Sequence, residues 1–235
     1  MTGAGEVRRL TAPARRHNGD MPSRYAQLFF GPTTRARQEA VNSHIAYSDG
    51  GEHDDGERMP LGPAQVGLIA GQRHFFLATV TPSGWPYIQH RGGPRGFVHV
   101  LDPLTVAFAD FEGNEQYVST GNIDADGRVA LFFVDYPTRT RLKLFGAARV
   151  VEADDDAALH ARLMTTPGGV IPSPSRRMVV VAVEAWDMNC RKYIQPRYER
   201  DAVDAMIAPY RDDLAAANAR IAELEAQLAA KGDPR

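Results

Sequence analysis

The chain has 235 residues, of which 43% are hydrophobic and 24% charged, a composition typical of a globular protein with one sizeable domain plus extensions. The formal net charge of −2 argues against a general attraction to nucleic acid or anionic membranes, and no apolar run approaches the roughly 20 residues that span a bilayer. The single cysteine, Cys190, excludes an intrachain disulfide framework, and the basic N-terminus lacks the hydrophobic stretch of a secretory signal. We therefore expect a soluble cytoplasmic protein without nucleic-acid or membrane partners.

The N-terminal part of the chain has weak signals of regular structure. Residues 1–22 are rich in Gly, Ala and Arg, which predicts a disordered or loosely attached segment. Residues 23–72 are expected to form a helical and loop extension. Within it the sequence predicts a helix around 34–44, an acidic Gly-rich loop over 48–58 and a short helix over 61–70.

Residues 73–200 are expected to form the principal domain, a closed or nearly closed antiparallel β-barrel. Short β-rich runs follow one another there, separated by turns and few helices, as in small barrels. The expected strands are 74–81, 85–90, 96–101, 104–109, 128–135, 141–152 and 178–187. One helix, over 154–166, is expected to pack outside the barrel.

The tail, residues 201–235, is predicted to be an amphipathic helix. Its apolar residues recur at spacings of three and four, as in a short heptad seam, at Leu214, Ala217, Ile221, Leu224 and Leu228. Two interpretations stay open: a short coiled coil that joins two chains, and a helix packed on its own barrel.

A first candidate binding cluster, Gln89, His90, Arg91 and Gly92, closes an expected strand. Arg followed by two glycines places a guanidinium beside backbone that a ligand can approach closely. A tight hairpin with a solvated arginine would explain the same residues.

A second cluster is a polar array near an expected helix start. Its amides, phenol and hydroxyl are those of Asn114, Gln116, Tyr117, Ser119 and Asn122. Exposed backbone N–H groups at such a start can bind phosphate, whereas a helix cap with a polar loop is the alternative. Asp110 and Glu112 argue against an anion directly over their own side chains.

A third cluster is the alternating row Arg139, Arg141 and Lys143. A strand would project all three onto one face, where they repel one another unless an anion lies among them. A solvated basic face is the alternative. Taken in order, the three clusters point to a phosphorylated, ring-bearing cofactor, for which FMN is the best candidate.

Other chemistries have no support in the sequence. No histidine pairs with a second ligand at helical metal-binding spacing, so no metal site is expected. A serine-hydrolase elbow, a Walker loop and a dinucleotide fingerprint are absent. No catalytic side chain is assigned.

Taken together, these residues resemble the pyridoxamine 5′-phosphate oxidase-like, FMN-binding split-barrel family, in particular one uncharacterised branch of it. The likeness covers roughly residues 23–200. The stretches that carry it most clearly are 75–102, 105–123, 128–150 and 189–198.

The resemblance implies a six-stranded split barrel that forms a homodimer with two flavin sites at the subunit interface. The flavin-lining strand would end at Gln89, His90 and Arg91, and the phosphate and ribityl chain would meet the region of Asn114, Gln116, Tyr117 and Ser119. A ring-facing position would be Arg141, and the partner chain would contribute Lys192 and Arg197. The Arg-x-His element that holds pyridoxine phosphate in the true oxidases is replaced here by YIQPRYERD, so oxidation of vitamin B6 is not expected.

The expected function is therefore that of an FMN-dependent oxidoreductase acting on a small molecule, with chemistry supplied by the flavin. Two alternatives stay open. One is a non-catalytic protein that binds or senses a flavin, and the other is a reductase that uses a deazaflavin on the same fold.

Overall fold

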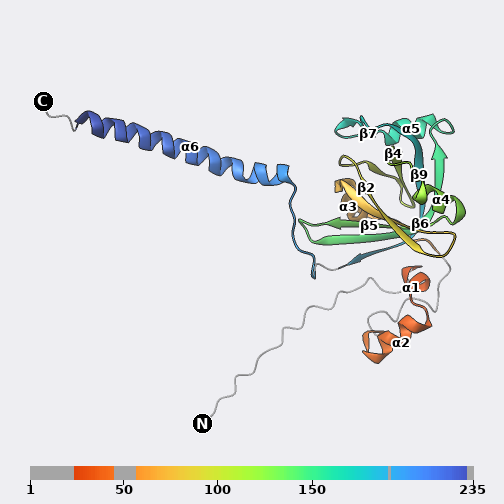
Figure 1. Ribbon diagram of the computed structural model, residues 1–235. Helices are drawn as coiled ribbons and strands as arrows, with labels where there is room; N and C mark the ends of the chain where they lie inside the picture. Colours follow the sequence, from red (N-terminus) through yellow and green to blue (C-terminus); the bar gives the residue numbers. More distant parts are fainter. Residues whose placement is uncertain (1–23, 45–56, 190–191, 232–235) are drawn as a thin grey trace, which may run out of the picture.

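Figure 1 shows the computed structural model, which describes residues 24–44, 57–189 and 192–231. Its centre is an antiparallel sheet of seven strands in the order β2-β1-β5-β6-β9-β4-β3. The strands are β1 (His74–Val80), β2 (Pro86–Gly92), β3 (Val98–Asp102), β4 (Thr105–Phe111), β5 (Arg128–Asp135), β6 (Thr140–Glu152) and β9 (Ser175–Asn189). The expected mainly β split-barrel fold is confirmed, with seven strands in the sheet rather than six.

Each strand forms where the sequence alternates between core-facing and outward-facing residues. In β1, Phe75 and Leu77 are fully buried, whereas His74 and Phe76 are partly exposed on the other face. The longest ladder joins β6 to β9 and runs from Arg141 to Glu152. This ladder holds the middle of the sheet together.

The β6–β9 ladder shifts register after Phe145, and the next residue is a glycine. A Cβ atom at Gly146 would overlap the carbonyl oxygen of Ala182 on β9. Only glycine therefore allows the two backbones to approach this closely at the irregularity.

The core lies on the inner side of the curved sheet. Phe75 stands at its centre, with ring centroids 5.0 Å from Phe108 and 5.2 Å from Phe133. Leu131, Leu142, Leu144 and Val181 complete this cluster and are fully buried. Burial of each such side chain stabilises the fold by about 1.5–3 kcal/mol.

Within the described ranges, five short helices surround the sheet. They are α1 (Arg24–Phe29), α2 (Pro32–Ala40), α3 (Pro63–Gly71), α4 (Val118–Ala125) and α5 (Ala157–Leu163). The helix expected over 61–70 is confirmed as α3, which starts with a proline in its first turn, where no amide hydrogen is needed. The helix expected over 154–166 is shorter, because Thr165–Thr166 forms β7 and pairs with β8 (Gly169–Val170).

Helix α1 covers part of the outer face of the sheet. The ring of Phe29 lies 4.2 Å from that of Phe145 on β6, and Tyr25 lies 5.8 Å from the same ring. The segment 1–22 and most of the acidic loop expected over 48–58 lie outside the described residues.

The last helix, α6 (Arg200–Lys231), leaves the barrel and projects away from it (Figure 1). Of the two interpretations of this helix, packing on its own barrel is therefore not what the structure shows. Among the described residues, no helix has both the length and the apolar character that crossing a membrane requires.

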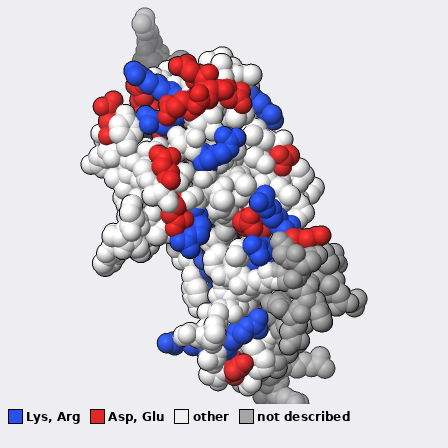
Figure 2. Space-filling view, turned by 90° about the vertical axis from the view of Figure 1, so that its right-hand side faces the viewer, with Lys and Arg blue, Asp and Glu red and all other residues white. Residues whose placement is uncertain are grey.

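Charged side chains are spread over the surface. On the face shown in Figure 2, Lys and Arg side chains are scattered among Asp and Glu rather than joined into one basic area. On this face, a site that favours anions would therefore have to be built locally.

Candidate functional site

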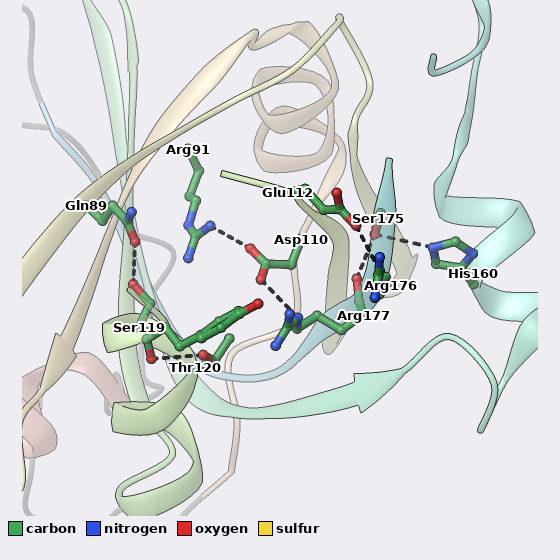
Figure 3. Close-up of polar contacts among 11 residues, drawn as sticks. Gln89, Arg91, Asp110, Glu112, Ser119, Thr120, His160, Ser175, Arg176 and Arg177 are labelled. Atoms are coloured by element: carbon green, nitrogen blue, oxygen red, sulfur yellow. Dashed lines mark hydrogen bonds and ion pairs between the residues drawn. The ribbon is translucent and has the colours of Figure 1, made fainter. Parts of the chain in front are cut away.

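A pocket of about 280 Å³ lies where β2, the end of β4, the start of α4 and the start of β9 meet. Figure 3 shows its polar residues pointing toward one another from these four elements. The polar side chains that line it belong to Tyr87, Gln89, Arg91, Asp110, Glu112, Asn114, Glu115, Gln116, Tyr117, Ser119, Thr120, Arg176 and Arg177. The first two predicted clusters therefore come together in part.

Strand alternation decides which residues of β2 reach the pocket. Gln89 and Arg91 point to the pocket side, so His90 and Gly92 belong to the other face. Ser119 Oγ donates a 2.6 Å hydrogen bond to Gln89 Oε1, which ties the start of α4 to β2. The site is thus built on regular elements that hold its side chains in place.

Asp110 binds two arginines at the centre of the pocket. Its Oδ1 accepts a 2.5 Å hydrogen bond from Arg91 Nη1, and its Oδ2 lies 3.7 Å from Arg177 Nε. These side chains are only 10–20% exposed. Arg91 Nε is buried without a hydrogen-bond partner, so this guanidinium has one donor that its own chain does not use.

Arg177 also contacts an aromatic ring. Its Cζ atom lies 4.5 Å from the centroid of Tyr117, a cation–π contact. Burial alone would lower the pKa of Arg177, but its interactions with Tyr117 and Asp110 outweigh this and raise the pKa above its ordinary value. Arg177 is therefore a fixed positive charge in the pocket, as arginine is in proteins generally.

The charges that line the pocket balance. Three arginines, Arg91, Arg176 and Arg177, face three acids, Asp110, Glu112 and Glu115. Arg176 Nε pairs with Glu112 Oε1 at 2.9 Å near the rim. The pocket therefore has no excess positive charge, and an anion would have to be held by directed hydrogen bonds.

Helix α4 offers such hydrogen bonds. It starts after Tyr117, which adopts a left-handed backbone conformation with φ of 52° and makes no side-chain cap. The first three residues of the helix, 118–120, line the pocket. The first backbone N–H groups of a helix have no partner within it, and they point toward negative charge.

Three residues of the first two predicted clusters lie outside the pocket. Asn122 is buried and donates a 2.9 Å hydrogen bond from Nδ2 to Thr79 Oγ1 in the interior. His90 stacks on His74 on the outer face, with centroids 5.4 Å apart. Gly92 lies beside the His90 ring and the carbonyl oxygen of Arg73.

The third predicted cluster, Arg139, Arg141 and Lys143, does not form one row on a strand, and none of its members lines this pocket. Arg139 lies in the turn before β6 with a positive φ of 56°, so the alternation begins only at Arg141. Lys143 lies opposite Asp187 on β9. Asp187 is ten residues further along that strand than Arg177 of the pocket, a separation of about 33 Å along an extended strand. The prediction that one strand projects all three cations onto one face is wrong, because Arg139 lies in the turn. A role of Arg141 or Lys143 in binding a ligand stays a prediction.

Lys143 already has partners. Its Nζ lies 2.7 Å from Asp187 Oδ2 and donates a 3.1 Å hydrogen bond to the hydroxyl of Tyr25 on α1. Burial alone would lower the pKa of Lys143, but these two partners raise it overall. Lys143 therefore joins α1 to the sheet.

Lys192 and Arg197, expected to come from a partner chain, make local contacts in this chain. Lys192 Nζ lies 5.1 Å from the ring of Tyr193, and Arg197 Cζ lies 4.8 Å from the ring of Tyr136 in the β5–β6 turn. Neither residue lines the pocket of its own chain. Their predicted role in the site of a second chain stays a prediction.

Sequence reasoning missed Arg176 and Arg177. The expected strand began at residue 178, and this boundary left both arginines in a loop. Their place depends on the pairing of β9 with β4, where Asp110 lies opposite Arg177. No local signal indicates that pairing, because the two strands lie more than sixty residues apart in the chain.

In the parts of the chain that the structure describes, no group of His, Cys, Asp and Glu side chains is arranged to hold a metal ion. The pocket is therefore the candidate site with the most support. Its chemistry is that of directed hydrogen bonds, a stacked phenol ring and a balanced set of charges, of which Arg91, Asp110 and Arg177 are largely buried.

Comparisons with known proteins agree with this fold. Residues 61–190 match the model of the family described as pyridoxamine 5′-phosphate oxidase. None of the curated proteins matches.

Several solved structures are similar. A putative pyridoxamine 5′-phosphate oxidase from Lactobacillus delbrueckii is 28% identical, covers 55% of this chain and 93% of its own, and has a TM-score of 0.42. An F420 reductase is 21% identical, with 54% and 98% covered and a TM-score of 0.42. An FMN-binding protein from Syntrophomonas wolfei is 13% identical, with 68% and 98% covered and a TM-score of 0.38.

Proposed function

Since this chain belongs to the pyridoxamine 5′-phosphate oxidase family, we propose that it is an oxidoreductase that binds FMN in the pocket between β2, β4, α4 and β9 and acts on a small molecule. The observation that carries the proposal is Arg91, whose Nε is buried without a partner while Nη1 is held by Asp110. A phosphate oxygen is the kind of acceptor that such an oriented donor fits.

The remaining pocket residues suit the parts of this cofactor. The phosphate would be held by Arg91 and by the first N–H groups of α4. The amides of Gln89, Asn114 and Gln116 are donors and acceptors for a flat polar ring or its ribityl chain. FMN would supply electron transfer when bound, and the protein would supply orientation and hydrogen bonds.

We further propose that two chains complete each site. A volume of about 280 Å³ is at the lower limit of ligand pockets, which range over roughly 300–1,000 Å³, so one chain would enclose only part of a flavin. Trp85 and Ile88, next to and within β2, are large apolar side chains exposed to solvent. A second copy packed on this strand would cover them and bring Lys192 and Arg197 toward the site.

The first experiment is a visible absorption spectrum of the purified protein after FMN is added and free ligand is removed. Flavin absorption that stays with the protein supports the proposal. A protein that releases all added FMN overturns it, and retention of a deazaflavin instead would favour the alternative cofactor.

A second experiment locates the phosphate. Dissociation constants for FMN and for riboflavin, which lacks the phosphate, are measured by quenching of flavin fluorescence. Arg91→Gln should weaken FMN binding about tenfold or more, equivalent to about 1.4 kcal/mol, and affect riboflavin much less. Arg149→Gln is the matched control, because Arg149 is an exposed arginine on β6 that does not line the pocket. Equal losses for both ligands would place the phosphate elsewhere.

The enzymatic part of the proposal has its own test. Bound FMN is reduced chemically under anaerobic conditions, and its reoxidation by a panel of small-molecule acceptors is followed by absorbance. Reoxidation that is faster than that of free reduced FMN supports an oxidoreductase. A bound flavin that reacts no faster than free flavin with any acceptor favours the non-catalytic binding protein.

A further inference from the structure

Helix α6 exposes an apolar stripe over almost its whole length. It has 32 residues, which corresponds to about 48 Å, and it extends away from the barrel (Figure 1). Tyr210 is 74% exposed, Leu214 62% and Leu228 70%. The ion pairs that it makes, such as Arg220 with Glu223, lie within the helix itself.

The stripe is a regular heptad seam. Its members are separated alternately by four and three residues and are Val203, Ile207, Tyr210, Leu214, Ala217, Ile221, Leu224 and Leu228. It therefore continues through nearly four heptads, further toward the barrel than the five residues identified from the sequence. In heptad notation Ile207, Leu214, Ile221 and Leu228 occupy the a positions and the others the d positions.

Pro209, inside the helix, does not interrupt this seam. It occupies a c position, on the outer side of the helix relative to the stripe. Its ring therefore stays outside the contact between helices, although it removes one backbone hydrogen bond.

A helix of this kind needs a partner for its apolar face. Most helical stability in proteins comes from packing of such a face rather than from intrinsic propensity. Heptads sustained over three to four repeats with charged flanking positions are the pattern of a coiled coil. The partner that matches a self-complementary seam is a second copy of the same helix.

We propose that α6 pairs with α6 of a second chain as a parallel, two-stranded coiled coil. In the parallel arrangement a g position lies near the following e position of the other helix. Arg220 would then face Glu225 of the second helix, twice by symmetry, and Asp213 would face Asn218 without repulsion. In one heptad, the β-branched Ile221 at a is followed by Leu224 at d, the combination that favours two strands.

The antiparallel arrangement is less favourable by the same reasoning. The register with the greatest overlap places Val203 beside Leu228 of the other helix. Asp213 would then face Arg220 and Asp204 would face Glu225, each twice by symmetry, so that two repulsive pairs offset the two attractive ones. Like charges at such positions suppress the wrong pairing.

The coiled coil does not depend on what the pocket binds. Its consequence for the barrels is that they would be tethered at one end, near Arg200. A tether of this kind raises the effective concentration of each barrel near the other to the millimolar range, about that of short flexible linkers. A weak contact between barrels would then form without a large interface.

The test uses the full-length chain with single cysteines. The native thiol is removed by Cys190→Ser, and Leu224→Cys is introduced at a d position of the seam. Mild oxidation should join two chains by a disulfide, seen as a covalent dimer on a non-reducing gel, because parallel pairing brings the two residues 224 together. Ala226→Cys, at an outward f position two residues away, is the matched control and should remain largely monomeric on the gel.

Three results would overturn the proposal. One is the absence of cross-linking through residue 224. A second is equal cross-linking through 224 and 226, which indicates random collision. A third is a disulfide formed only when Ile207→Cys and Leu224→Cys chains are mixed, which indicates antiparallel pairing.

A charge in the seam checks the result independently. In the Leu224→Cys background, Ile221→Glu should abolish the cross-link, whereas Ala222→Glu, on the outer side of the helix, should leave it intact. FMN retention by the Ile221→Glu chain is measured in parallel. Loss of the cross-link with retained flavin separates this proposal from the proposed function, and a cross-link that survives Ile221→Glu contradicts the coiled coil.

Discussion

The two ends of the β6–β9 ladder carry the same kinds of charged side chain but use them differently. At one end Asp110 holds Arg91 and Arg177 at the wall of a pocket, and Arg91 keeps a buried donor without a partner. At the other end Lys143 is shared between Asp187 and Tyr25 beneath α1. An arginine has five donors in a rigid plane, so one carboxylate leaves donors unused, whereas the three donors of a lysine are more readily satisfied. A basic residue whose own chain leaves a donor unused is therefore a candidate ligand-binding group, and Arg141, whose Nε is likewise buried without a partner, shares this property with Arg91.

The largest expected effect is at the pocket end, in Asp110→Ala. This change leaves Arg91 and Arg177 close together and partly buried without their shared carboxylate. We expect a loss of about 3 kcal/mol in the free energy of unfolding, at the lower limit for a broken buried pair because these side chains are not wholly buried. Urea unfolding followed by circular dichroism measures it. The double variant Asp110→Ala with Arg91→Gln should recover part of the loss, and no recovery would show that the two side chains are not coupled.

The next effect concerns the balance of charge in the pocket. Asp110→Asn keeps the shape of the side chain and removes one of the three negative charges. If phosphate is bound here, FMN should bind about tenfold more tightly relative to riboflavin, equivalent to about 1.4 kcal/mol. The ratio of the two dissociation constants is the measurement. An unchanged ratio would mean that the phosphate does not approach Asp110.

A smaller effect is expected at the opposite end, in Lys143→Ala. The ion pair with Asp187 is partly exposed to solvent, at 31% and 23% for the two side chains. The loss in the free energy of unfolding should therefore be about 1 kcal/mol or less. The FMN dissociation constant should not change. A clear loss of flavin affinity would show that this end also contributes to the site.

The smallest effect is the response to pH at His74, near the β5–β6 turn. Burial lowers the pKa of His74 below its ordinary value, and nearby His90 lowers it further, against the opposing effect of Glu199. The unfolded chain then binds more protons than the folded one just below the ordinary pKa of about 6.5. Stability contributed by neutral His74 is present above that pH and is lost as the pH falls through the lower, folded-state pKa.

Thermal unfolding at pH 7.5 and pH 5.5 measures this response in the wild type and in His74→Gln. The variant should lose part of the decrease in stability seen at the lower pH. A residual decrease is expected, because burial also lowers the pKa of His99. Identical pH dependence in both proteins would contradict the assignment to His74.

Much of the fold could be read from local patterns. The strand expected over 74–81 is observed as His74–Val80, and the strand expected over 128–135 has the same bounds. Both predictions rest on short β-rich runs bounded by turns, which are local features of the chain. The C-terminal helix was equally accessible, since its heptad spacing is local.

The candidate site could be predicted only in part. Gln89, Arg91 and the polar residues that precede and begin α4 were identified, because they are dense polar clusters at strand and helix ends. Side chains alternate between the two faces of a strand, so Gln89 and Arg91 line the pocket, whereas His90 between them points to the other face. The sequence-based prediction grouped these three residues without applying this alternation. Arg139 was misplaced because its left-handed conformation in a turn ends the alternation before β6.

The sequence by itself determined the strands, their inward and outward faces and the seam of α6, because each follows from periodicity over a few residues. Tertiary structure alone decided the partners of the cations at the pocket and beneath α1. Asp110 meets Arg177 because β4 pairs with β9, and Lys143 meets Tyr25 because α1 lies on β6. Such pairings join residues far apart in the chain, and their energies depend on burial and distance, which no local pattern records.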